Sequence, residues 1–66
     1  MSMSLKAARQ ISGLTQKEMA EKMGICRHTY MKYEKEPNQI PIGAAKAISK
    51  ITGVGIDEIF FGHKST

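Results

Sequence analysis

The side chains best suited to chemistry lie between positions 24 and 34, where the sequence reads GICRHTYMKYE. Arg27, His28 and Lys32 supply several hydrogen-bond donors, and a neutral histidine can also accept. If this segment is a helix, its turn of about 100° per residue places Arg27, Met31, Lys35, His28 and Lys32 within an arc of about 140°. The spacing predicts a helix with one basic face.

The opposite side of this helix is expected to pack inward. Tyr30, Tyr33 and Cys26 fall opposite the basic arc, and aromatic residues at helical spacing favour a core. A face of one charge sign gains little from ion pairs along the helix, which favours contact with an anion. A merely solvated basic face is the alternative interpretation.

Other kinds of site find little support in the sequence. Its single cysteine excludes an intramolecular disulfide. The spacing of Cys26, His28 and His63 matches no zinc motif, so we expect no metal and no cofactor. Cys26 is either a redox-active thiolate or, more simply, a small buried or capping residue. His28 and Glu34 lie about 240° apart around the helix, which predicts no enzymatic activity. We expect no small-molecule ligand either.

Length and charge narrow the class of protein. The 66 residues are 41% hydrophobic, which predicts one domain, 1–66, with a thin core. The net charge of +4 lies entirely in residues 1–35, whereas residues 36–66 are balanced. This asymmetry favours a polyanion as partner of the N-terminal half. No apolar run resembles a signal peptide or a membrane span, so we expect a cytoplasmic protein.

The pattern along the chain predicts helices and no strands, because no segment alternates with period two. The expected helices cover about 4–12, 15–23, a segment beginning at Cys26, 41–52 and 56–61. Thr15 and Glu18 have the spacing of a capping box. Gly24 lies where a helix ends with a residue in the left-handed conformation. Pro41 lies where the first turn of a helix is expected.

Residues 15–35, TQKEMAEKMGICRHTYMKYEK, resemble the helix-turn-helix of the phage Cro and repressor family, the XRE-type regulators. The likeness consists of a glutamine at the start of helix 2 (Gln16), a small residue in its middle (Ala20) and a glycine in the turn (Gly24). Apolar residues also occupy the expected positions: Met19, Met23, Ile25, Tyr30 and Tyr33. The ending TGVGIDEIF also resembles this family. The resemblance implies an all-α, compact five-helix DNA-binding domain, with the motif at helices 2 and 3.

The same resemblance implies roles for individual residues on double-stranded DNA. Base contacts fall to Arg27, His28, Lys32 and Met31. Backbone contacts fall to Gln16, Lys35, Asn38, Gln39 and Thr15, although Thr15 also fits a purely structural role. The loop after helix 3 departs from basic versions by containing Glu36, which puts insertion of an arginine into the minor groove in doubt.

Two further expectations follow from the resemblance. Arg9 and Glu34 match positions that form a partly buried ion pair. The family binds near-palindromic operators as homodimers, and Ile56, Phe60 and Phe61 are the candidates for the dimer interface, with plain core residues as the alternative.

The expected function is that of a sequence-specific transcriptional regulator, Cro-like or a small repressor. An antitoxin or a restriction-modification controller could use the same domain. A different class is a protein-interaction module that has kept the fold and lost DNA binding.

Overall fold

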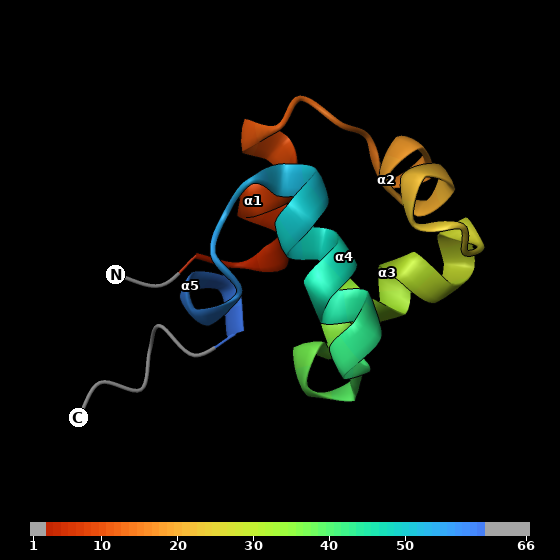
Figure 1. The fold of residues 1–66 in the computed structure, drawn as a ribbon. Coiled ribbons are helices and arrows are strands. Elements are labelled where there is room, and N and C mark those ends of the chain that lie inside the picture. Colours follow the sequence, from red (N-terminus) through yellow and green to blue (C-terminus); the bar gives the residue numbers. More distant parts are fainter. Residues whose placement is uncertain (1–2, 61–66) are drawn as a thin grey trace.

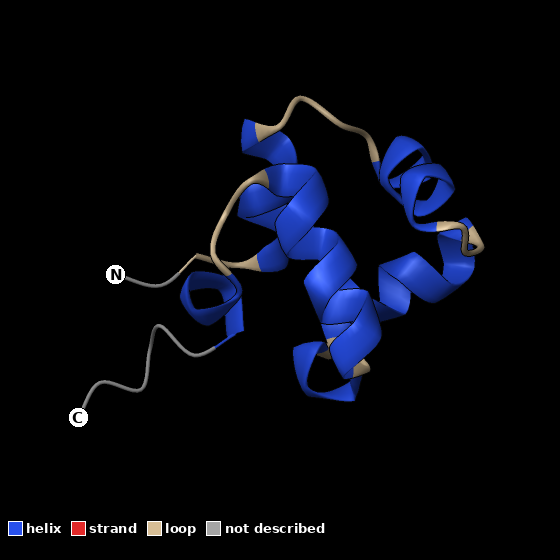
Figure 2. Cartoon of the chain, viewed as in Figure 1, coloured by secondary structure: helices blue, strands red, loops and turns tan. Residues whose placement is uncertain are grey.

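A computed structural model of the chain describes residues 3–60. Within this part every regular element is helical, which confirms the all-α prediction (Figure 2). The elements are α1 (Leu5–Ile11), α2 (Gln16–Met23), α3 (Arg27–Lys35), the 3-10 helix η1 (Pro37–Gln39), α4 (Ile42–Thr52) and α5 (Ile56–Phe60). Figure 1 shows α4 between α1 and α5 on one side and α2 and α3 on the other.

The first two helices begin at side-chain caps. The Ser4 hydroxyl accepts a hydrogen bond from the Ala7 amide at 3.0 Å. At α2 the predicted capping box is present: the Thr15 hydroxyl accepts from the Glu18 amide at 3.1 Å, and the Glu18 carboxylate accepts from the Thr15 amide at 2.9 Å. These bonds satisfy amides that a first helical turn leaves without partners. Both starts are therefore encoded locally.

The turn between α2 and α3 depends on Gly24. Its φ of 73° lies in the left-handed region, as predicted, and lets the chain leave α2 sharply. The Ile25 amide then donates to the Ala20 carbonyl at 3.0 Å. Ala20 is buried where α2 packs on α3, so a short turn and a small side chain together set the approach of the two helices.

Two helix starts differ from the sequence predictions. Cys26 is the N-cap of α3, but its side chain is exposed and makes no capping hydrogen bond, so the prediction that it packs inward is wrong. With a ψ of 148° its backbone is extended, and a helical wheel does not describe it. Pro41 is the N-cap of α4 and does not lie in its first turn. Its carbonyl accepts from the Ala45 amide at 2.9 Å.

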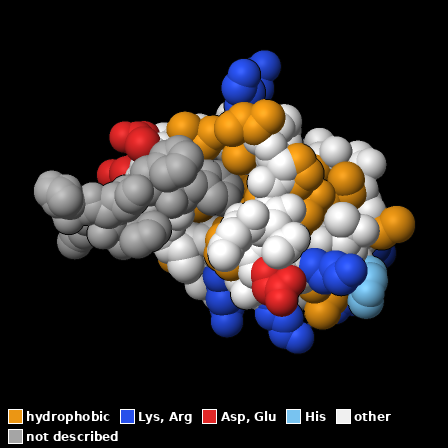
Figure 3. Space-filling view, turned by 90° about the horizontal axis from the view of Figure 1, so that it is seen from below, with side chains coloured by type: hydrophobic (Ala, Val, Ile, Leu, Met, Phe, Trp, Pro, Cys, Tyr) orange, Lys and Arg blue, Asp and Glu red, His pale blue; other side chains and the backbone are white. Residues whose placement is uncertain are grey.

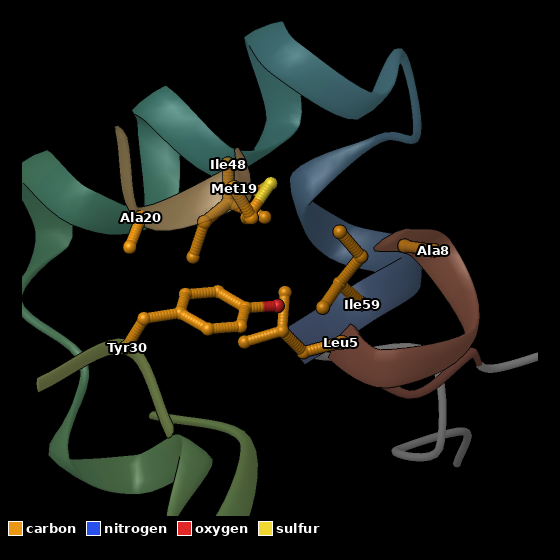
Figure 4. Close-up of a cluster of buried hydrophobic side chains, with 7 residues drawn as sticks. All are labelled: Leu5, Ala8, Met19, Ala20, Tyr30, Ile48 and Ile59. Carbon is orange, nitrogen blue, oxygen red and sulfur yellow. The ribbon is translucent and has the colours of Figure 1, made fainter. Parts of the chain in front are cut away.

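One hydrophobic cluster joins the helices. Its buried members come from all five α-helices and are Leu5, Ala8, Met19, Ala20, Tyr30, Ile48 and Ile59. Figure 4 shows the Tyr30 ring extending from α3 into the middle of these side chains, where it is 0% exposed. The predicted inward side of α3 is thus confirmed for Tyr30, whereas Tyr33 is half-buried at the edge of the cluster.

The helices of residues 3–60 are short. The longest, α4, has 11 residues, and no helix in this range combines the length and the apolar character that a membrane crossing requires.

Replacing Gly24 by alanine should lower the free energy of unfolding by about 1–2 kcal/mol, because an L-residue is strained in the left-handed region. Apart from Gly24 and its two chain neighbours, no atom lies within 4 Å of the added Cβ, so the effect comes from the backbone conformation and not from a clash with the rest of the fold. Gly43→Ala is the matched control. Gly43 also has open space around its Cβ but lies within α4, so alanine should stabilise by about 0.5–1 kcal/mol. Urea unfolding measures both, and equal effects of the two substitutions would contradict this account.

Candidate nucleic-acid interface

The outer side of α3 carries the predicted basic arc. Its five members, all exposed, are Arg27, His28, Met31, Lys32 and Lys35. They lie opposite the buried Tyr30. Met31 is the apolar member of this side and is 41% exposed. In Figure 3 several Lys and Arg side chains, with a histidine, gather towards the lower right of the face shown. The structure therefore gives α3 one side for packing and one side for solvent or a partner.

Two open hollows connect this face with the start of α2. The first lies over the N-terminus of α2 and is lined by Lys6, Arg9, Thr15, Gln16, Lys17 and Arg27. The second lies along α3 and is lined by Lys6, Gln16, His28, Met31, Lys32, Glu34 and Lys35. Lys6 and Gln16 line both hollows. The two hollows therefore form one continuous surface, which extends from the start of α2 to the end of α3.

The start of α2 adds donors to this surface. The first amides of a helix carry partial positive charge and point outward along the axis, which makes a helix N-terminus attractive to anions. Gln16 is the first residue of α2 and is half-buried, and Lys17 beside it is exposed. The region can therefore hold a phosphate group by hydrogen bonds and by charge.

Beneath this surface the Glu34 carboxylate accepts three hydrogen bonds. Arg9 Nε donates to Oε2 at 2.7 Å, which is the expected ion pair. The Tyr30 hydroxyl donates to the same oxygen at 2.5 Å, and Gln16 Nε2 donates to Oε1 at 3.0 Å. Arg9 Nη1 also donates to the Leu14 carbonyl at 2.8 Å. The carboxylate thus joins α1, α2 and α3.

This network shifts the pKa of each ionisable member. Burial alone would raise the pKa of Glu34, but the hydrogen bonds from Arg9, Tyr30 and Gln16 outweigh it and lower the pKa below its ordinary value. Burial works against the charge of Arg9, yet the bond to Glu34 still raises the pKa of this guanidinium. Burial and the neighbouring carboxylate raise the pKa of Tyr30. At neutral pH the network therefore holds an ionised pair and a neutral phenol.

The remaining candidates from the sequence lie in η1, in and after α5, and at the N-cap of α2. Asn38 and Gln39 are exposed in η1, directly after α3. Ile56 is half-buried in α5, whereas the side chain of Phe60 and the whole of Phe61 lie outside the described residues. Thr15 uses its hydroxyl in the capping box and also lines the first hollow.

Two lysines of this surface were not among the residues predicted from the sequence. Lys6 and Lys17 come from α1 and α2 and line the hollows. The basic excess of residues 1–35 was a signal for both, but only the folded arrangement brings Lys6 beside α3. Among residues 3–60 no cluster of three or more His, Cys, Asp or Glu side chains could hold a metal ion.

Comparisons with known proteins identify the family to which the chain belongs. The profile of the family described as Helix-turn-helix matches residues 5–59. An uncharacterized HTH-type transcriptional regulator from Methanocaldococcus jannaschii is 38% identical over 56 residues, which cover 85% of this chain and 85% of that protein. No solved structure matches the chain significantly.

The Glu34 network should make stability depend on pH at both extremes. Because the pKa of Glu34 is lowered in the folded state, this residue stabilises the fold at pH values above its ordinary pKa of 4.5. That stabilisation is lost as the pH falls through the pKa of the folded state. Because the pKa of Tyr30 is raised in the folded state, this residue stabilises the fold at pH values below its ordinary pKa of 10.0. That stabilisation is lost as the pH rises through the pKa of the folded state. Urea unfolding midpoints from about pH 2 to 12 measure both limbs.

Single substitutions separate the two contributions. Glu34→Gln should flatten the acid limb, and Tyr30→Phe the alkaline limb. If both variants show the same dependence of stability on pH as the wild type, other groups cause that dependence.

Proposed function

We propose that this chain, which belongs to the Helix-turn-helix family, is a DNA-binding transcriptional regulator that reads a specific sequence in the major groove with α3. The observation that carries the proposal is the exposed basic side of α3, continuous with the hollow over the N-terminus of α2. A helix fits the major groove of B-DNA, where each base pair presents a distinct pattern of donors and acceptors.

The side chains on α3 suit base edges. Arg27 and Lys32 can donate to guanine O6 and N7, and His28 can donate or accept according to its protonation. The exposed Met31 lies on the same side and can contact a thymine methyl group. Arg27 also lines the hollow over α2, so it lies where base and backbone contacts meet.

The start of α2 suits the phosphate backbone. Gln16 has a second amide hydrogen available beyond the one that it gives to Glu34. Lys6 and Lys17 add charge to the same hollow, and exposed Lys35, Asn38 and Gln39 extend the surface beyond α3. Backbone contacts of this kind fix the register of a protein on the duplex, while base contacts specify the sequence.

The finer part of the proposal is a Cro-like homodimer that represses from a near-palindromic operator in the cytoplasm. In such dimers two recognition helices enter successive major grooves, about 34 Å apart. The half-buried Ile56 in α5 is a candidate for the contact between protomers, together with Phe60 and Phe61. This part rests on the resemblance of residues 15–35 and 52–60 to Cro and repressor proteins.

Selection of bound sequences from a random pool of duplex DNA, near physiological salt, tests both sequence-specific binding and the spacing expected of a dimer. We expect enrichment of one motif, with two half-sites separated by about one helical turn. Failure to enrich any sequence, or binding to random duplex with equal strength, would instead favour an interaction module that has lost sequence-specific DNA binding.

Arg27→Ala and Lys32→Ala should each cost about 1–3 kcal/mol on the selected site and relax the base preference at one position. Gln16→Ala should weaken binding to all sequences alike, because a phosphate contact carries no sequence information. Fluorescence anisotropy on selected and scrambled duplexes measures these effects. Equal losses of Arg27→Ala on both duplexes would refute a base contact by this residue.

Lys6→Ala should reduce the dependence of log affinity on log salt concentration by about one phosphate contact, a change in slope of about 0.9. Lys46→Ala is the matched control, because Lys46 is an exposed lysine of α4 that lines neither hollow. Binding titrations at several salt concentrations give the slopes, and identical slopes for the two variants would remove Lys6 from the interface.

A further inference from the structure

We propose that the Tyr30 hydroxyl is a positioning group for DNA binding: through Glu34 it fixes the side-chain amide of Gln16 at the surface where DNA lies. The inference rests on the proposed function and deepens it. A residue on the packing side of α3, with no access to DNA, would then control the contact made by a residue on α2.

The geometry points to this role because one planar carboxylate links the two side chains. The Tyr30 hydroxyl donates to Glu34 Oε2 at 2.5 Å, and Gln16 Nε2 donates to Oε1 at 3.0 Å. Since both oxygens belong to the same rigid group, a bond that fixes Oε2 also restricts where Oε1 lies. The Tyr30 ring is 0% exposed and held by the core, so its hydroxyl is a fixed point against which the carboxylate is oriented.

The carboxylate in turn fixes the amide of Gln16. An ionised carboxylate only accepts hydrogen bonds, so the nitrogen of the Gln16 amide, and not its oxygen, must face Glu34. Its second N–H is then available to a phosphate beside Lys6 and Lys17. A glutamine without such an anchor loses rotamer freedom when it binds, which weakens binding. Preorganisation by Glu34 removes part of this cost.

Arg9 alone does not account for the position of the carboxylate. It shares Oε2 with Tyr30, but it reaches that oxygen from α1 and also donates to the Leu14 carbonyl. Tyr30 and Glu34 lie one turn apart on α3 itself. The tyrosine therefore sets the direction of the carboxylate relative to the helix that reads DNA, while the arginine sets its direction relative to α1.

A double-mutant cycle on DNA affinity tests the coupling. Tyr30→Phe should weaken binding to the selected duplex by about threefold to tenfold, the range expected for one hydrogen bond. In the Gln16→Ala background the same substitution should change affinity by less than about twofold, because the side chain that it positions is gone. Circular dichroism at the assay temperature verifies that each variant is folded.

Tyr33→Phe is the matched control. Tyr33 is half-buried on the same helix, and its hydroxyl takes part in none of the side-chain hydrogen bonds among residues 3–60, so its loss should leave DNA affinity unchanged. An equal effect of Tyr30→Phe in both Gln16 backgrounds would overturn the inference and assign the tyrosine a structural role only.

A second measurement needs no DNA. In the free protein, Tyr30→Phe should shift the side-chain amide NMR signals of Gln16 and leave those of the exposed Gln10 in place. Unmoved Gln16 signals would overturn the inference even if the chain binds DNA. Shifted Gln16 signals in a chain that binds no duplex would instead refute the proposed function and retain the positioning of Gln16 by Tyr30.

Discussion

The arrangement of α1, α2 and α3 depends on the carboxylate of Glu34, which is largely removed from water together with its partner Arg9. Their side chains are only 9% and 10% exposed, and desolvation of two charges is costly unless further hydrogen bonds offset it. Here Arg9 and Tyr30 donate to one oxygen and Gln16 to the other. No buried side-chain nitrogen or oxygen within residues 3–60 lacks a partner. The network is therefore complete, and such networks favour one unique arrangement.

This constraint explains how a thin core can hold a well-defined surface. Side chains such as Tyr30 and Met19 bury apolar area, but apolar contacts tolerate small changes in helix orientation. Hydrogen bonds to one carboxylate do not, because their strength falls steeply with distance and angle. The network thus fixes the start of α2 against α3 to within a narrow range. At the other end of this helix pair, the sharp turn at Gly24 restricts how the end of α2 lies against the start of α3. The outer residues of α2 and α3 therefore form one rigid surface.

Local patterns predicted most of the fold, and tertiary contacts account for the misses. The capping box of Thr15 and Glu18 and the left-handed Gly24 involve residues close in sequence, so spacing alone identified them. Cys26 was assigned to the packing side because the helical wheel was extended one residue too far, into an N-cap with extended backbone. Nothing local connects Lys6 to α3, and the hydrogen bond between Gln16 and Glu34 spans 18 positions. The Arg9–Glu34 pair was anticipated from the family resemblance and not from the pattern of residues.

Under the proposed function, the distribution of charge around α3 would make the interface with DNA asymmetric. Lys6, Lys17 and Arg27 lie on the side of α2, whereas the segment after α3 contains Glu36 and the amides of Asn38 and Gln39 but no cation. Beyond Lys35, phosphate contacts on that second side would then come from neutral donors, which add little to counterion release. Electrostatic attraction would then come from the cations of α1, α2 and α3, which surround the anchored Gln16, and not from the segment after α3. The start of α2, which the hydrogen bonds to Glu34 hold rigidly, would accordingly set the register of the domain on the duplex. With that register set, α3 would contact the bases.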